Sequence, residues 1–146
     1  MNTVFQHILV AVDSSPSRRG AVRLAADMAR LTGAKVSVVH VAAAAATLAA
    51  VVSLEDEQEA GAVLDEALTA LREAGVTAEG TVVHALTTQI ATTISAAAEE
   101  QGADLLVLSP HHRGSLEALI HPRVSDIVAH GARTAVLLAP EDEQSR

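Results

Sequence analysis

The stretch that decides the fold prediction is Asp104–Ser125, which reads DLLVLSPHHRGSLEALIHPRVS. It begins with a short apolar run, Leu105–Leu108, that has the length and composition of a buried strand. A polar turn with two His and one Arg follows, and we expect a helix to begin near Val124. In an open parallel sheet, ligands bind in the loops that leave the carboxyl ends of central strands. This stretch therefore predicts a strand, a binding loop and the start of a helix.

Strands and helices are expected to alternate along the rest of the chain. Apolar, largely β-branched runs predict strands, and apolar residues at helical spacing that stop at a glycine predict helices. We expect strands at 4–12, 34–41, 76–83, 105–108 and 135–139, and helices that end at Gly33, Gly75, Gly102 and Gly131. Residues 42–54 stay open, because their alanines permit a helix but supply no polar face.

Five strands alternating with four helices predict an α/β fold with one doubly wound, five-stranded parallel sheet. Right-handed crossovers would place helices on both faces of that sheet. We expect residues 1–140 to form a single domain and residues 141–146 to form a charged C-terminal tail. The helix after the first strand is expected to use Ser14 or Ser15 as its cap, and the third helix Thr87 or Thr88.

Composition argues against several classes of function. The chain has one Phe, no Trp, no Tyr and a formal charge of −8, so it lacks stacking platforms and would repel a nucleic acid. It has no Cys, which removes thiolate metal sites and cysteine nucleophiles. The amino-terminal residues lack the basic region of a signal peptide, and the uncharged run 41–52 is shorter than the roughly 20 residues of a membrane span. We expect a cytoplasmic protein with no membrane or nucleic-acid partner.

Motifs of other doubly wound proteins are missing. Residues 13–18, directly after the first strand, lack the glycines of a Rossmann dinucleotide site, and the P-loop pattern does not occur. A receiver domain would need paired acids, where this chain has Asp13 alone. The Gly-x-Ser-x-Gly elbow of hydrolases is also absent. We therefore expect no catalytic residues.

Two long segments resemble the universal stress protein family. The opening segment Ile8–Val41 reads ILVAVD and then SSPSRRGAVRLAADMARLTGAKVSVVHV, and it is similar to that family's first strand, helix and second strand. The ending DLLVLSPHHRGSLEALIHPRVSDIVAHGARTAVLLAP is similar to its last two strands and the helix between them. The resemblance covers residues 1–140 and implies the strand order 3-2-1-4-5 and a homodimer formed through the last strands. It also implies one of two kinds of member, those that bind ATP and those that do not.

The resemblance also implies a nucleotide site. Asp13 matches the family's acid beside ribose and adenine, although a carboxylate that only caps the following helix remains an alternative. Val41 matches the small apolar residue that lines the adenine. The family's phosphate loop follows the pattern Gly, two residues, Gly, nine residues, Gly, then Ser or Thr. Here these positions are Ser109, His112, Pro122 and Arg123, after which Val124 and Ser125 match again.

The replaced glycines predict weakened or lost ATP binding. Glycine lets a backbone approach phosphate closely, and Pro122 removes an N–H at a helix start where phosphate would find donors. A compensating feature is the basic character of the loop, which holds His111, His112, Arg113 and Arg123. These cations could bind an anion in place of the backbone. His111 and His112 could equally belong to an ordinary surface loop, or less readily to a metal site.

We therefore expect a homodimeric stress-response protein that acts through binding or regulation, with an unknown protein partner. The alternative is a protein that binds ATP, AMP or another anionic small molecule through its basic loop. Slow ATP hydrolysis, as in some members of the family that the chain resembles, is the third interpretation. It ranks last, because no residue besides Asp13 and the loop histidines could act as a general base.

Overall fold

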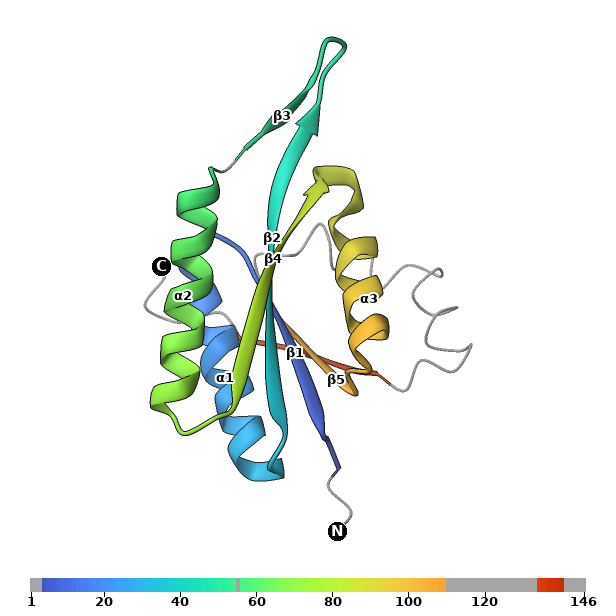
Figure 1. Cartoon of the computed structure of the whole chain (residues 1–146). Helices are drawn as coiled ribbons and strands as arrows, with labels where there is room; N and C mark the ends of the chain where they lie inside the picture. Colours follow the sequence, from blue (N-terminus) through green and yellow to red (C-terminus); the bar gives the residue numbers. More distant parts are fainter. Residues whose placement is uncertain (1–3, 55, 110–133, 141–146) are drawn as a thin grey trace.

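A twisted central sheet carries helices on both faces in the computed structural model, which describes residues 4–54, 56–109 and 134–140. Helices α1 and α2 cover one face of the sheet and α3 covers the other (Figure 1). The elements are β1 (His7–Val12), α1 (Arg18–Thr32), β2 (Lys35–Ala46), β3 (Val51–Ser53), α2 (Glu57–Glu73), β4 (Ala78–Leu86), the 3₁₀ turn η1 (Thr87–Gln89), α3 (Ile90–Gln101), β5 (Leu105–Leu108) and β6 (Ala135–Leu138).

The strand pairing confirms the predicted fold class. Five strands run parallel in the spatial order β4-β2-β1-β5-β6, which is the expected order 3-2-1-4-5 once the parallel strands are numbered along the chain. The sheet has one strand more than predicted, because the short β3 pairs antiparallel with the end of β2. The helix expected between Val124 and Gly131 lies outside the described residues.

The alanine-rich segment, left open from the sequence, forms a β-hairpin. Strand β2 continues five residues past the predicted end at Val41, and Ala44 pairs with Ser53 of β3. The hairpin reaches beyond the sheet (Figure 1), and its Leu48 is fully exposed. Neighbouring strand β4 explains the extension, because it pairs with β2 as far as Ala44. Tertiary pairing thus decides the conformation of a segment whose composition allowed a helix.

The described helices end at the predicted glycines, but they do not begin at the predicted capping residues. Gly33, Gly75 and Gly102 have positive φ angles of 75°, 81° and 66°, the left-handed conformation in which glycine is favoured. The predicted serine and threonine caps are wrong. Ser17 precedes α1 and its side chain makes no cap bond, while α3 follows a 3₁₀ turn that contains both threonines.

Two apolar layers hold the helices against the sheet. The first joins alternate residues of β1 and β2 to α1 and α2, with Leu71 fully buried at its centre. The second joins the intervening residues to α3, with Ile94 fully buried. Because side chains alternate across a strand, a sheet covered on both faces must be apolar at consecutive positions. All six residues of β1 are buried, which explains why its sequence shows no alternation.

Candidate functional site

Two predicted site residues, Asp13 and Ser109, lie at one edge of the sheet, and a third, Val41, lies at the same level within β2. Register places Val12 of β1 beside His40 of β2, so Asp13 and Val41 come one step further along their neighbouring strands. On the other side of β1, Ala11 pairs with Leu108 of β5, so Ser109 follows at the level of Val12. The carboxyl ends of β1 and β5 therefore bring Asp13 and Ser109 to the same edge, at the level at which Val41 lies within β2. This edge is where doubly wound proteins bind ligands.

Asp13 closes the tight turn that joins β1 to α1. Its Oδ1 accepts a hydrogen bond of 2.9 Å from the backbone N–H of Ser15, the contact of an Asx turn. The residue is half-buried and makes a further polar interaction. The carboxylate thus has a structural role in the turn, but it does not cap α1, which begins at Arg18 after Ser17.

A chain of serine hydroxyls connects the two loops at this edge. The Oγ atoms of Ser15 and Ser17 lie 2.7 Å apart, and those of Ser17 and Ser109 lie 2.8 Å apart. Ser17 and Ser109 are both buried, Ser109 completely. Buried hydroxyls need such partners, and this explains why the Ser17 side chain does not cap α1. The bond between Ser17 and Ser109 joins the start of α1 to the residue that follows β5.

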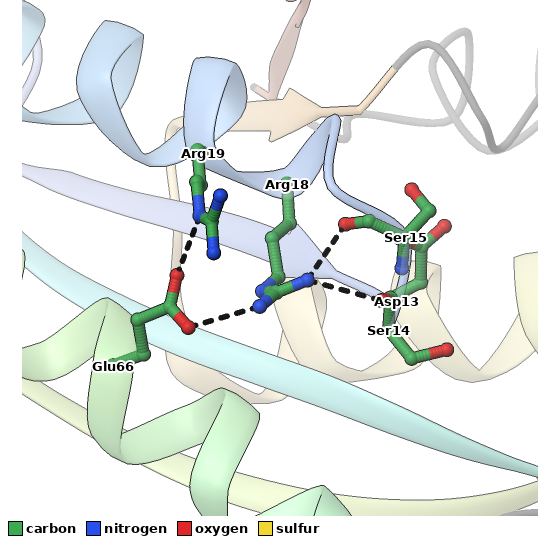
Figure 2. A network of polar contacts seen from close by, with 6 residues as sticks. All are labelled: Asp13, Ser14, Ser15, Arg18, Arg19 and Glu66. Carbon is green, nitrogen blue, oxygen red and sulfur yellow. Dashed lines mark hydrogen bonds and ion pairs between the residues drawn. The ribbon is translucent and has the colours of Figure 1, made fainter. Parts of the chain in front are cut away.

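Arg18 holds the same turn from the helix side. Its Nη1 donates to the backbone carbonyls of Ser14 and Ser15, at 3.0 and 2.9 Å (Figure 2). Its side chain is only 12% exposed, and its buried Nε has no partner among the described atoms. A cation so far removed from water needs a nearby opposite charge.

Glu66 of α2 supplies that charge. Its Oε2 accepts from Arg18 Nη2 and its Oε1 from Arg19 Nε, both at 2.9 Å (Figure 2). The hydrogen bonds from Arg19 and Arg18, and then the charges of both guanidinium groups, hold the pKa of Glu66 below its ordinary value. Glu66, Arg18 and the carbonyls of Ser14 and Ser15 thus form a polar network that ties α2 to the turn beside Asp13.

The predicted site residues have different outcomes. Val41 lies inside β2 and not at its end, is 5% exposed, and belongs to the apolar layer under α3. Ser109 is where the sequence placed it, directly after β5. The remaining predicted residues lie outside the described part of the chain: His111, His112, Arg113, Arg123, Val124 and Ser125.

Sequence reasoning missed the residues that fix the first loop, namely Ser17, Arg18 and Glu66. Arg18 and Glu66 are 48 positions apart and come from different helices, so no local spacing pairs them. A partial signal existed, because a cationic pair directly after a Ser-rich turn stands out in an acidic chain. Among the described residues, no group of three or more His, Asp and Glu side chains is placed to hold a metal ion. In the same part of the chain, no helix is long and apolar enough to cross a membrane.

A doubly wound parallel sheet with an acid directly after β1 defines a class of α/β proteins in which ligands, where they bind, lie at the carboxyl edge. The sequence matches the universal stress protein family over residues 5–140. The chain belongs to that family. No curated protein sequence matches it significantly.

Solved structures of the same family share the fold. A universal stress protein from Burkholderia pseudomallei is 25% identical, with a TM-score of 0.69 over 97% of this chain and 100% of that one. The Archaeoglobus fulgidus universal stress protein in complex with dAMP is 24% identical, with a TM-score of 0.63 over 94% of this chain and 99% of that one. A universal stress protein in complex with cAMP is 23% identical, with a TM-score of 0.62 over 95% and 98% of the two chains.

Proposed function

We propose that this protein is a homodimeric stress-response protein that acts by binding a partner, with an affinity for ATP below that of a relative with an intact glycine loop. The observation that carries this proposal is the environment of Ser109, at the first glycine position of the loop. Its side chain is fully buried and its hydroxyl lies 2.8 Å from Ser17 Oγ. A buried side chain bonded to the start of α1 replaces the open backbone that a phosphate cradle uses.

The loop sequence beyond Ser109 supports the same proposal. His112 adds a side chain at the second glycine position, and Pro122 removes a backbone donor at the third. The negative charge of a triphosphate needs several backbone N–H donors to stabilise it, whereas the smaller charge of a single phosphate needs fewer. We therefore expect the triphosphate to lose more affinity than a monophosphate does.

Nucleoside monophosphate binding is the second candidate function. The relatives solved with dAMP and cAMP support it, because each of these ligands carries one phosphate and the two structures share this fold. In this chain Asp13 lies at the carboxyl edge, and the sequence supplies His111, His112, Arg113 and Arg123 in the loop after β5. These side chains would take over from the missing glycine backbone and bind one phosphate. Neither candidate needs a catalytic step.

Calorimetric titration with Mg-ATP and with AMP tests both candidates. We expect ATP to bind with a dissociation constant of roughly 1 mM or weaker, equivalent to about −4 kcal/mol. Saturable ATP binding at micromolar concentration would contradict the weakened site. AMP binding that is lost in a His112→Ala/Arg123→Ala variant, but kept in an Asp27→Asn control on α1, would establish the second candidate.

Strand β6 is the proposed dimer interface. Among the described strands it pairs only with β5, so within that part of the chain its other edge has no partner strand. Val136 and Leu138 are 44% and 45% exposed, which is high for large apolar side chains in a strand. Pairing with a second copy would cover both. Sedimentation should show a dimer for the native chain and a monomer for Val136→Lys, and a native monomer would remove this part of the proposal.

A further inference from the structure

A groove of about 420 Å³ runs between α1 and α2, beginning beside the Arg18–Glu66 pair. Its volume falls within the range of sites that hold small molecules or peptide segments. Alanines and Val22 form much of its apolar lining, and charged side chains complete it. The lining residues are Arg18, Arg19, Val22, Arg23, Ala26, Asp27, Arg30, Glu66, Ala67, Ala70 and Ala74.

The groove is basic although the protein is acidic. Four of the ten Lys and Arg residues of the chain line it, all from α1. Asp27 and Glu66 oppose them, so four positive and two negative charges leave the groove at +2, against −8 for the whole chain. Arg18 and Glu66 already form an ion pair with each other within the polar network. A positive surface of this kind attracts an acidic ligand or segment.

Arg19 is the cation best placed to accept a further partner. Only its Nε is bonded to Glu66, and the side chain is 64% exposed. A guanidinium carries five N–H donors, so both Nη atoms of Arg19 keep donors that the described residues do not use. Arg23 and Arg30 follow at spacings of four and seven residues along α1 and line the same groove. Together these three residues present a row of cations along one helix.

The described chain ends next to this row. A Cβ added to Gly20 of α1 would lie 3.8 Å from the carbonyl oxygen of Pro140, so the backbone passes over the first turns of α1. The residues that follow Pro140 read EDEQSR and carry three acids within their first three positions. Six extended residues span roughly 20 Å, whereas Gly20 and Arg30 are about 15 Å apart along the helix axis. The three acids extend roughly 10 Å past Pro140, which brings them alongside Arg19 and Arg23, and the whole segment is long enough to reach Arg30.

We propose that the acidic segment 141–146 docks into the groove between α1 and α2. Glu141, Asp142 and Glu143 would pair with the arginine row, and the alanine lining leaves room for an extended backbone. Each exposed pair contributes little alone, but several pairs to a segment already anchored at Pro140 act at high effective concentration. Docking would fix the end of β6 to α1. This inference does not depend on the proposed function, since it involves neither Asp13 nor the loop after β5.

Disulfide trapping tests the docking directly, because the chain has no Cys of its own. Gln144→Cys leaves the three acids in place, and Ala70→Cys puts a thiol on the α2 side of the groove. Thr69→Cys is the matched control, because Thr69 is equally exposed on α2 but does not line the groove. Under mild oxidation at low protein concentration, we expect the Gln144/Ala70 pair to cross-link roughly tenfold faster than the Gln144/Thr69 pair.

Charge dependence separates docking from chance encounter. In about 1 M salt, the cross-linking rate of the Gln144/Ala70 cysteine pair should fall to that of the Gln144/Thr69 control. The same fall is expected when Arg23→Gln and Arg30→Gln are combined with the Gln144/Ala70 pair. Circular dichroism of each variant verifies that α1 and α2 remain folded. Equal rates for the two cysteine pairs, or a fast rate indifferent to salt and to the arginine substitutions, would overturn the proposal. The free peptide EDEQSR should slow the Gln144/Ala70 cross-link by competing for the same groove.

Discussion

Replacing Glu66 with Gln should destabilise the protein, because it removes the counter-charge of a nearly buried arginine. Glu66 accepts from Arg18 and Arg19 at 2.9 Å in both cases. The Arg18 side chain is 12% exposed and its Nε is buried without a partner among the described atoms, so the remaining hydrogen bonds matter to its stability in the fold. Gln offers one oxygen where Glu offers two, and its amide group would face a guanidinium donor.

The size of the effect follows from the two pairs taken separately. A hydrogen bond to a charged group contributes about 1.5–3 kcal/mol, but Glu66 is 42% exposed, so water offsets part of the loss at the Arg18 pair. The Arg19 pair is more exposed and is worth about 0.2–1 kcal/mol. We expect Glu66→Gln to lower the free energy of unfolding by about 2 kcal/mol, which shifts a urea midpoint by roughly 1 M.

Urea unfolding at neutral pH measures the change. Glu73→Gln is the matched control, because Glu73 lies on the same helix, is exposed, and makes no ion pair with the described residues. We expect less than about 0.5 kcal/mol for that control and less than about 1 kcal/mol for Arg19→Gln. A double-mutant cycle on Arg18 and Glu66 should give a coupling of about 1 kcal/mol or more. A coupling near zero would refute the role assigned to this pair.

The pH dependence gives a second test of the same reasoning. The folded pKa of Glu66 is lowered, so its stabilisation is complete above the unfolded pKa and disappears as the pH falls through the folded pKa. The carboxyl group of an unfolded Glu has a pKa of about 4.3. The difference in unfolding free energy between the native chain and Glu66→Gln should therefore shrink on acidification from about pH 5 downward. A difference that stays constant would show that the charge of Glu66 is not the cause.

Four further substitutions concern the fold, and the same unfolding experiment can measure their effects. Gly80→Ala should cost about 1–3 kcal/mol, because the new Cβ would lie 3.0 Å from the backbone carbonyl of Val38 in the neighbouring strand as well as 2.6 Å from Leu64 Cδ1, and the strand backbone cannot move aside as the leucine can. By contrast, Gly61→Ala on α2 meets nothing within 4 Å and should stabilise by about 0.5–1 kcal/mol. Asp56→Ala should cost about 0.5–2 kcal/mol and shorten α2, since the Asp56 carboxylate caps that helix at 2.7 Å. Leu71→Ala should cost about 2–5 kcal/mol, because Leu71 is fully buried; a cost below about 1 kcal/mol would contradict the assigned core.

Much of the scaffold was predictable because its signals are local. Strand β5 matches its predicted bounds, since a run of only four apolar residues is too short for a helix and suits a strand buried on both faces. The glycines that end α1 and α3 were recognised because the left-handed conformation after a helix favours that residue. Alternation of strands and helices predicted the parallel sheet, the family resemblance implied its strand order, and the pairing confirms both.

The carboxyl-edge site was predictable only in part. Asp13 and Ser109 could be placed because they directly follow strands, and register then brings strand ends together whatever their side chains are. The bond between Ser17 and Ser109 could not be foreseen, because a serine before a helix favours capping unless a distant hydroxyl competes for it.

The sequence by itself determined the class of fold, the acidic charge of the chain and the erosion of the glycine loop, since each depends on residue type and order alone. Only the tertiary structure decided that residues 42–46 extend β2, that Arg18 and Glu66 meet, and that four arginines share one groove. The physical reason is the same in each case. Contacts between residues far apart in sequence choose among conformations that local preferences leave nearly equal in free energy.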